Sequence, residues 1–391
     1  MNNSALRFAY RLSLNYGAIF ASLGLYLPFM PIWLSYRGMG PAEIGIITSA
    51  PLFIRVLAAP SIAIWSDRQG DHRTTIMLGS WCASACAAAL FFAHGFWPIF
   101  LLVIVFQIST QSVLPLLETK ALAGARRHDL DYGRMRLWGS VAFIAANLLG
   151  GAVISHYGSA SVLAMVTVAI ASTALAAHVL PREPKDMHGR EIAPNQRAAL
   201  TGLWQLLRQP WFIVTMLAAG LIQGSHAVYY AFSAIHWRSI GIGDGWIGIL
   251  WALGVAAEIA LFAVSKRALQ RLGAVAMILI GGGAAVVRWA AMALDPAFWL
   301  LFPLQTLHAL TFGATYLGAL NLIQTEVDAS QSGTAQSIHA ALSAGIIMGG
   351  MTLMAGFAYA ELAETSFVIM AGAAILGCLA ALVLRRLVAS R

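Results

Sequence analysis

Five ionisable side chains lie inside long apolar segments of the sequence, and they are the residues best suited to chemistry. They are Arg55, Glu118, Arg136, Glu258 and Arg288. A charged side chain at membrane depth costs roughly 3 kcal/mol even on lenient insertion scales, so each one needs a reason to be there. Ion pairs between helices, or arginines that reach a headgroup, would explain any one of them alone. Together, three arginines and two glutamates could bind an organic anion and exchange a proton.

Polar and aromatic residues share helix faces with these charges. Gln107, Gln111 and Glu118, for example, stand at i, i+4 and i+11, which places them along one side of a helix. A single polar stripe is more often a contact between helices, but six stripes favour a water-accessible pathway. The six sets are Asn15, Ser22 and Tyr26; Gln107, Gln111 and Glu118; Arg136, Ser140, Phe143 and Asn147; His226, Tyr229, Tyr230 and Ser233; Trp251 and Glu258; and Gln305, His308 and Thr311.

The composition indicates which elements position these residues. The chain of 391 residues is 59% hydrophobic and only 10% charged, with a mean hydropathy of +0.75. Soluble domains contain about 25% charged residues, so a chain this apolar requires lipid as its solvent. These values exclude a soluble enzyme, a disordered tail protein and a disulfide scaffold.

Apolar runs of about 20 residues, which is long enough to cross a bilayer, recur twelve times. We therefore predict an all-α polytopic membrane protein with twelve transmembrane helices in two six-helix halves, residues 1–180 and 210–391. Residues 181–209 form the one long polar stretch of the sequence and are predicted to be a cytoplasmic linker. The predicted spans lie near 8–34, 43–65, 74–96, 98–123, 134–156, 160–180, 210–236, 245–265, 273–294, 297–324, 333–358 and 365–386.

The distribution of basic residues predicts the orientation. With the N-terminus inside, nineteen lysines and arginines fall in cytoplasmic segments, and two, Arg37 and Arg238, fall on the opposite side. This asymmetry is a strong positive-inside signal, so both termini are predicted to be cytoplasmic. The net charge of +8 is explained chiefly by topology, and we expect no nucleic acid partner.

Cofactor and catalytic motifs are absent from the sequence. It has no phosphate-binding loop of the form G-x-x-x-x-G-K-[ST], no histidine spacing typical of a metal site and no motif for Ser-His-Asp catalysis. We therefore expect no cofactor, no metal and no enzymatic activity, and ATP-driven transport is disfavoured.

The loop between the second and third spans carries a family resemblance. It reads SIAIWSDRQGDHR and resembles the signature G-x-x-x-D-[RK]-x-G-x-[RK]-[RK] of the major facilitator superfamily. Asp67, Arg68, Gly70 and Arg73 match it, while Ala63 replaces the first glycine. The resemblance implies the major facilitator fold and a gating loop, in which Asp67 and the basic residues latch helix ends on the cytoplasmic side.

Longer segments resemble the phenylpropionate permease group, which is similar to the oligosaccharide–proton symporters. The resemblance covers nearly the whole chain and implies a multi-pass protein of a bacterial-type inner membrane, driven by a proton gradient. Glu118 and Arg136 match an acid and an arginine that bind sugar in the symporters, and Phe143 falls where those carriers have a stacking tryptophan. Arg288 matches a span 9 arginine of their proton-coupling network, and His308 matches their span 10 histidine. The matching segments are GLYLPFMPIWL, PAEIGIITSAPLF, DYGRMRLWGSVAFI, QGSHAVYYAFSAIHW, LGVAAEIALF and LQTLHALTFG.

The sequence also departs from the sugar carriers. Gln305 and Thr311 replace their span 10 lysine and proton-carrying glutamate, Glu258 is displaced by about one turn from their span 8 acid, and Arg55 has no charged counterpart. The sugar-coupling scheme therefore does not transfer, and the aromatic-acid branch fits better.

The expected activity is 1:1 symport of a proton and a small aromatic carboxylate, such as 3-phenylpropionate, by alternating access of the two halves. Arg136, with Arg55, is expected to hold the carboxylate in a fork. Glu118 and Glu258 are the candidate proton carriers. Arg288 and His226 complete the expected proton-coupling set. The other expected substrate-binding residues are Tyr26, Phe143, Asn147, Tyr229, Tyr230, Trp251, Gln305 and His308.

Two alternatives stay open from the sequence. The nearer is symport of a neutral sugar or nucleoside, which the Glu118 and Arg136 match supports. The more distant class is a non-transporting sensor or an intramembrane enzyme, but the sequence has neither a soluble output domain nor a catalytic constellation. The expected partners are an organic anion, a proton and the lipid bilayer, and the protein is expected to act as a monomer.

Overall fold

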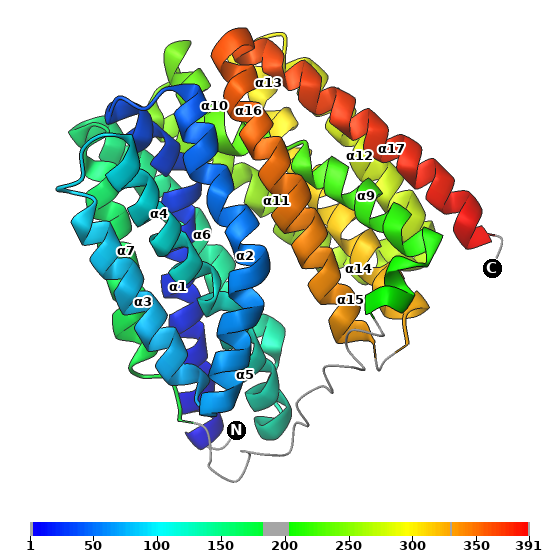
Figure 1. Cartoon of the computed structure of the whole chain (residues 1–391), viewed down its shortest axis with the longest axis horizontal. Coiled ribbons are helices and arrows are strands. Elements are labelled where there is room, and N and C mark those ends of the chain that lie inside the picture. Colours follow the sequence, from blue (N-terminus) through cyan, green and yellow to red (C-terminus); the bar gives the residue numbers. More distant parts are fainter. Residues whose placement is uncertain (1–2, 183–202, 329–330, 390–391) are drawn as a thin grey trace. The chain divides into compact units, whose positions relative to one another are not determined.

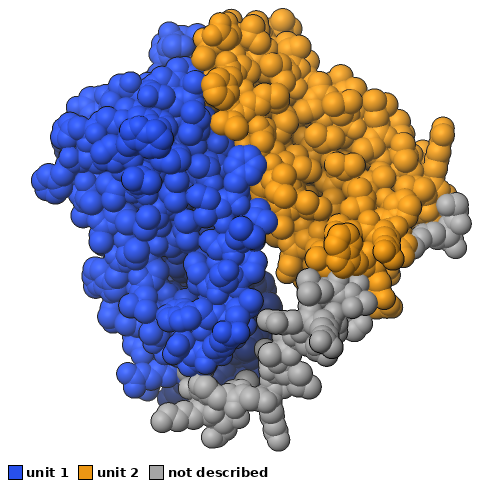
Figure 2. Space-filling view, in the orientation of Figure 1, with its two compact units in different colours: residues 1–191, 233–252 blue, residues 192–232, 253–391 orange. Residues whose placement is uncertain are grey.

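The computed structural model describes residues 3–182, 203–328 and 331–389, and these ranges form helices joined by turns, with no strand. The chain divides into two compact units, which Figure 2 draws in different colours. Unit 1 comprises Met1–Glu191 and Ser233–Ala252, and unit 2 comprises Ile192–Phe232 and Leu253–Arg391. Residues 183–202 of the predicted linker lie outside the described ranges, so the linker remains a prediction.

Unit 1 contains the first seven helices (Figure 1). Helix α1 packs against α6 and α7, α3 packs against α4 and α7, and α2 packs against α4. The bounds are α1 Asn3–Tyr36, α2 Pro41–Gln69, α3 His72–Ala89, α4 Phe96–Gln111, α5 Val113–His128, α6 Tyr132–Tyr157 and α7 Ser161–Ala177.

Two polar side chains join α1 to α7. Asn15 Nδ2 donates to the carbonyl oxygen of Ala176 at 2.9 Å, and the hydroxyls of Ser22 and Thr173 hydrogen-bond at 3.1 Å. Interhelical hydrogen bonds of this kind stabilise helix pairs in lipid. Two members of the polar stripe predicted on α1 therefore hold helices together, and residue spacing alone does not distinguish this role from lining a pathway.

Glycines permit two close helix crossings in unit 1. A side-chain carbon on Gly24 of α1 would lie 2.7 Å from the carbonyl oxygen of Phe143 in α6. A carbon on Gly248 of α11 would collide with the carbonyl oxygen of Asn147, also in α6. Small residues at such points allow helix backbones to approach in a membrane, and α6 is thereby fixed on two sides.

Residues 233–252 belong to unit 1 and form the end of α10 (Ala227–Ser239), a turn, and the start of α11 (Asp244–Leu272). Arg238 closes this turn, because its Nε and Nη2 donate to the two carboxylate oxygens of Asp244 at 2.6 and 2.9 Å. Its Nη1 donates to Ser159 Oγ at 2.7 Å, beside the start of α7. A bidentate pair adds geometric specificity, so Arg238 fastens the hairpin to the rest of unit 1.

In unit 2, α12 packs against α14 and α17, and α9 packs against α17. Trp289 of α12 donates from Nε1 to Ser225 Oγ at 2.7 Å, and its ring stacks on Phe367 of α17 with centroids 5.8 Å apart. The remaining bounds are α9 Pro210–Gly224, α12 Ala274–Met292, α13 Phe298–Thr306, η2 Ala309–Ala314, α14 Thr315–Glu326, α15 Ser332–His339, η3 Ala340–Ile347, α16 Met348–Leu362, η4 Ala363–Ser366 and α17 Phe367–Ala389.

Helical segments occupy each of the twelve ranges predicted as spans. Eight helical stretches in the described part of the chain are long and apolar enough to cross a membrane, by length and composition. The longest, Ser332–Ala389, has 58 residues and includes both α16 and α17. Helix α7 is apolar but is not among the eight, because its 17 residues are too few. The all-α membrane fold is confirmed, while the count of twelve crossings remains a prediction.

Candidate functional site

An ion pair joins α5 to α6 in unit 1. Arg136 Nε lies 3.7 Å from Glu118 Oε1, and the two side chains are 30% and 37% exposed. The guanidinium of Arg136 lies 4.0 Å from the ring centroid of Phe20 and 5.7 Å from that of Tyr16. A cation over an aromatic face is attracted by the ring quadrupole. The sequence predicts both charged residues but not the rings of Tyr16 and Phe20. These two residues are four apart and therefore share a face of α1, which is the sequence signal that could have identified them.

Gly139, about one turn after Arg136, makes room for this stacking. A side-chain carbon at Gly139 would lie 2.8 Å from Phe20 Cδ2 and 3.3 Å from Arg136 Nη1. The first distance is shorter than carbon atoms tolerate, and the contact is with the body of the ring. Any side chain here would therefore displace Phe20 from the guanidinium.

The change Gly139→Ala is expected to weaken substrate binding by about 2- to 30-fold, because the cation–π contact at Arg136 contributes about 0.5–2 kcal/mol. The measurement is the dissociation constant of the purified protein for its substrate. Gly283→Ala is the matched control, because an added carbon there meets no atom within 4 Å. Equal affinities for the two variants would contradict a role of this stacking in binding.

Arg55 lies in the middle of α2, and its Nη1 donates to Gln111 Oε1 at 3.2 Å. Gln111 is the last residue of α4, and α5 begins at Val113. Pro115 explains this break, because proline has no N–H to donate to the carbonyl of Gln111 four residues earlier. The predicted stripe of span 4 is thus divided between two helices, with Gln111 at their junction.

The predicted gating loop connects α2 to α3. Gly70 ends α2 with φ of 65°, a left-handed conformation that glycine adopts without strain. Asp67 Oδ1 lies 3.0 Å from His72 Nε2, and Arg73 Nη2 donates to the carbonyl oxygen of His178 at 2.7 Å. Arg68 is exposed. Within unit 1, this loop therefore holds the ends of α2, α3 and α7 together.

Three further residues predicted for substrate binding are buried in unit 1. Tyr26 stacks on Phe106 of α4 with ring centroids 5.3 Å apart. Asn147 Nδ2 donates to the carbonyl oxygen of Phe143 at 2.8 Å, within α6. Trp251 is 4% exposed, in the part of α11 that belongs to unit 1. Contacts within unit 1 thus hold Tyr26 and Asn147 in place, and Trp251 is enclosed by its surroundings.

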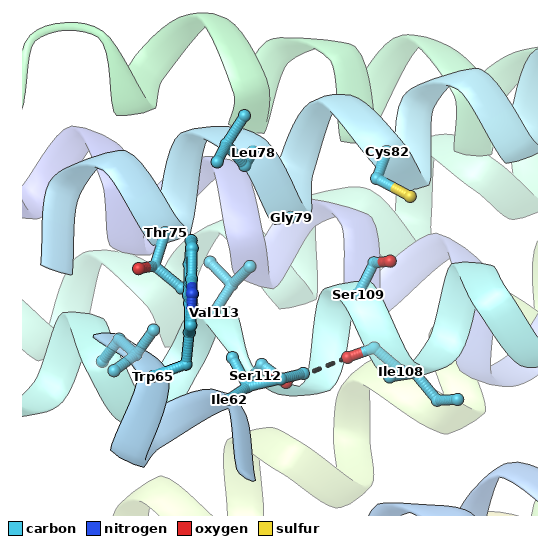
Figure 3. Close-up of a pocket in the computed structure, with 11 residues that line it drawn as sticks. Ile62, Trp65, Thr75, Leu78, Gly79, Cys82, Ile108, Ser109, Ser112 and Val113 are labelled. Carbon is cyan, nitrogen blue, oxygen red and sulfur yellow. Dashed lines mark hydrogen bonds between the residues drawn. The ribbon is translucent and has the colours of Figure 1, made fainter. Parts of the chain in front are cut away.

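A cavity of about 250 Å³ opens between α2, α3 and the α4–α5 junction in unit 1. Figure 3 shows mainly apolar side chains around it, with the Ser112 hydroxyl donating to the carbonyl oxygen of Ile108 at 3.0 Å. Its polar lining consists of serine, threonine and Cys82 side chains and the Trp65 indole. None of the predicted site residues lines it, so it is separate from the candidate site.

Arg288 of α12 is the centre of the polar network in unit 2, and it is fully buried. Its Nη2 donates to Gln305 Oε1 at 2.6 Å, and its Nη1 lies 3.3 Å from both Thr311 Oγ1 and His308 Nδ1. These three partners are uncharged or readily neutral groups. A buried guanidinium surrounded by such acceptors retains its charge but has no direct counter-ion among them.

His308 connects Arg288 to Glu258. Because a guanidinium can only donate, His308 Nδ1 accepts from Arg288 and the hydrogen is on Nε2. His308 Nε2 lies 3.4 Å from Glu258 Oε2, and the His308 and Glu258 side chains are 10% and 17% exposed. A neutral imidazole therefore lies between the arginine and the carboxylate, in the position of a proton relay.

His226 extends the network in the other direction. Its Nδ1 lies 3.0 and 3.2 Å from the carbonyl oxygens of Gln223 and Ile222, so Nδ1 carries the hydrogen. Its Nε2 then accepts from the Thr311 hydroxyl at 2.9 Å. The structure thus joins the two predicted histidines and the arginine by hydrogen bonds through Thr311, and it places Glu258 3.4 Å from His308. No residue spacing could establish this arrangement.

Aromatic rings enclose Arg288. The ring centroids of Tyr229 and Trp289 each lie 4.7 Å from the guanidinium carbon. Tyr230 stacks on His226 with centroids 5.5 Å apart. The sequence predicts the two tyrosines but not Trp289, which follows Arg288 directly and therefore gives no periodic signal.

A π-helical segment, η2, begins one residue after His308 and includes Thr311. Pro303 in α13 precedes it and removes one backbone hydrogen bond from this region. Single π-helical turns within α-helices frequently occur at functional sites. The irregular backbone therefore supports a functional role for the network around Arg288. No group of three or more His, Cys, Asp or Glu residues suited to a metal occurs in the described ranges.

Comparisons with known proteins cover nearly the whole chain. A model of the family described as "MFS_1 like family" matches residues 9–370. The chain is 33% identical over 367 residues to the "Probable 3-phenylpropionic acid transporter" of Escherichia coli (strain K12), and this match covers 92% of this chain and 93% of that protein. It is 23% identical over 346 residues to the maltose permease of Geobacillus stearothermophilus, and this match covers 88% of this chain and 85% of that protein. The crystal structure of the nucleoside transporter NupG matches with a TM-score of 0.81 at 16% identity, over 98% of this chain and 99% of that one, which shows a shared fold.

Proposed function

The chain belongs to the MFS_1-like family of the major facilitator superfamily and is a multi-pass secondary transporter, and we propose that it imports a small aromatic carboxylate together with one proton. The family expected from the sequence motifs is confirmed. The proposed substrate class is that of 3-phenylpropionate, and the proposed mechanism is alternating access of the two halves, driven by the proton gradient without a cofactor.

One observation carries the choice of substrate. In each unit an arginine within the membrane-spanning helices lies against aromatic rings: Arg136 against Phe20 and Arg288 against Tyr229. Aromatic rings close to embedded positive charge can pack against the ring of a ligand whose carboxylate binds an arginine of the same unit. The relative whose name specifies 3-phenylpropionic acid supports the same class.

The contacts of the two glutamates favour Glu258 as the proton carrier. Glu118 lies 3.7 Å from Arg136, so protonating it would leave that arginine without its counter-charge. Glu258 lies 3.4 Å from His308, which is neutral because it accepts from Arg288. Neutralising Glu258 therefore costs less electrostatic free energy at this contact, and His308 offers a route for the proton.

Uptake by proteoliposomes with an imposed pH gradient tests the proposal. Symport of one proton with one monoanion moves no net charge, so uptake should follow ΔpH, with about tenfold accumulation per pH unit. A membrane potential should have little effect on this electroneutral uptake. If each cycle moved one net charge instead, the potential would change its driving force by about 2.3 kcal/mol per 100 mV. A clear inward current on adding 3-phenylpropionate would contradict the 1:1 stoichiometry.

A neutral sugar or nucleoside is the second candidate substrate. The Arg136–Glu118 ion pair at 3.7 Å favours it, because such a pair can bind hydroxyl groups of a sugar by donating and accepting hydrogen bonds. Competition for uptake separates the two classes: inhibition by galactosides or nucleosides, with no effect of 3-phenylpropionate, would select this candidate.

The proposal includes a location and an assembly state. We place the protein in a bacterial-type inner membrane as a monomer, with both termini cytoplasmic. The nineteen basic residues on the predicted cytoplasmic side, against two on the other, support this orientation. Access of a membrane-impermeant thiol reagent to a cysteine introduced near either terminus, in sealed cells, tests it.

A further inference from the structure

We propose that Arg55, with Gln111 beside it, receives the carboxylate of the substrate, and that Arg136 does not. The inference rests on the proposed transport of an aromatic acid and specifies where its charge is bound. From the sequence, both arginines are expected to hold the carboxylate together. In unit 1, however, Arg136 contacts a carboxylate and Arg55 contacts a neutral amide, so we assign them different roles.

Arg136 already has a counter-ion. Its guanidinium lies 3.7 Å from the Glu118 carboxylate and over the ring of Phe20. A substrate carboxylate approaching Arg136 would therefore meet the negative charge of Glu118 close by, and like charges repel at this distance. For an anion to bind there, Glu118 would first have to be protonated or move away.

Arg55 has no acidic partner among the described residues of the chain. Its recorded polar contact is with the amide oxygen of Gln111, at 3.2 Å from Nη1. Its side chain is partly buried in the middle of α2. A guanidinium at membrane depth with a neutral partner is a site of uncompensated positive charge, which an anion would stabilise.

The charges embedded in the two units support this assignment. Of the five embedded charges singled out in the sequence, unit 2 contains Arg288 and Glu258, and His308 connects them. Unit 1 contains the other three, Arg55, Arg136 and Glu118, of which Arg136 and Glu118 pair with each other. The single surplus positive charge among these five residues is therefore located at Arg55.

The geometry of the Arg55–Gln111 contact leaves donors available. Arg55 uses Nη1 for this contact, so Nε and Nη2 remain to bind a carboxylate in a fork. Gln111 accepts through Oε1, which leaves its amide nitrogen as a further donor. The break between α4 and α5, which Pro115 explains, places Gln111 at a helix junction opposite Arg55.

The experiment compares two probes of the same shape, 3-phenylpropionate and its neutral amide, 3-phenylpropionamide. Dissociation constants are measured for purified wild type, Arg55→Gln and Arg55→Lys. Arg55→Gln should weaken binding of the carboxylate by about 10- to 100-fold, the range of a lost charge-assisted contact, and should affect the amide far less. Arg55→Lys should restore part of the loss, because it keeps the charge but not the fork.

Two further variants make the result specific. The double variant Glu118→Gln/Arg136→Gln removes the ion pair without changing net charge, and should weaken binding of both probes by a similar factor. Arg134→Gln is the matched arginine control, because the Arg134 side chain is 88% exposed at the start of α6. It should bind both probes as wild type does.

The outcomes separate this inference from the proposed function. If wild type prefers the carboxylate and Arg55→Gln keeps that preference while the double variant loses it, Arg136 holds the anion and the inference is wrong. If wild type shows no preference for the carboxylate, or binds neither probe, the aromatic-acid assignment itself is wrong and the inference is overturned with it. Loss of the preference in Arg55→Gln alone supports both.

Discussion

Replacing Glu258 with glutamine is expected to abolish accumulation of substrate against its gradient while leaving exchange of internal for external substrate intact. Glutamine has nearly the shape of a protonated glutamate but cannot release a proton. The loaded carrier would therefore still change conformation, whereas proton-coupled net transport would stop. His308, 3.4 Å from Glu258, can still donate from Nε2 to an amide oxygen, so the fold around the site should persist.

The measurement compares pH-driven uptake with counterflow in the same proteoliposomes. Wild type should accumulate about tenfold per pH unit, and Glu258→Gln should only equilibrate. Glu361→Gln, an exposed position at the end of α16, is the control and should accumulate as wild type does. If Glu258→Gln still accumulates and Glu118→Gln does not, Glu118 is the proton carrier. Accumulation by both would place the carrier elsewhere.

Replacing Arg288 with lysine is expected to destabilise unit 2 by about 3 kcal/mol and to remove transport. Arg288 is fully buried, and its guanidinium reaches Gln305, Thr311 and His308 at once. A lysine ammonium is a compact charge without the planar fork, so it cannot reproduce this set of contacts or the stacking on Tyr229. The polar groups left without a partner would then carry a desolvation cost.

Thermal unfolding in detergent, followed by intrinsic tryptophan fluorescence, measures the first effect, and proteoliposome uptake measures the second. Arg267→Lys is the matched control, since Arg267 is exposed near the end of α11. A wild-type melting temperature together with wild-type transport in Arg288→Lys would show that the fork geometry is dispensable. If Arg288→Lys loses transport but keeps the wild-type melting temperature, the contacts of Arg288 serve transport and not stability.

Local patterns in the sequence predict part of this site well. Glu118, Arg136, Glu258 and Arg288 are recognised because a charge inside an apolar run is costly wherever it lies. The helices around them follow from long apolar runs with proline and glycine at their interruptions. The loop from Asp67 to Arg73 is recognised because its residue types and order are specific.

Contacts between distant segments are not encoded in such patterns. Asn15 and Ser22 share a helix face with Tyr26, yet they bind α7, while Tyr26 stacks on α4. Phe20 lies over Arg136 because Gly139 leaves space for its ring, and no period in the sequence relates Phe20 to the two residues of α6. Trp289 is similar, since its role depends on which side of α12 faces α9 and α17.

The sequence by itself determined the solvent, the helical class and the identity of the embedded charges. Each of these depends on composition or short-range spacing, which act through hydration and local backbone geometry. Only the tertiary structure decided which charge meets which partner: Arg136 with Glu118, Arg288 with Gln305 and His308, and Arg55 with the neutral amide of Gln111. Electrostatic free energy depends on distances of a few ångströms between side chains far apart in the chain, and only packing of the helices sets those distances.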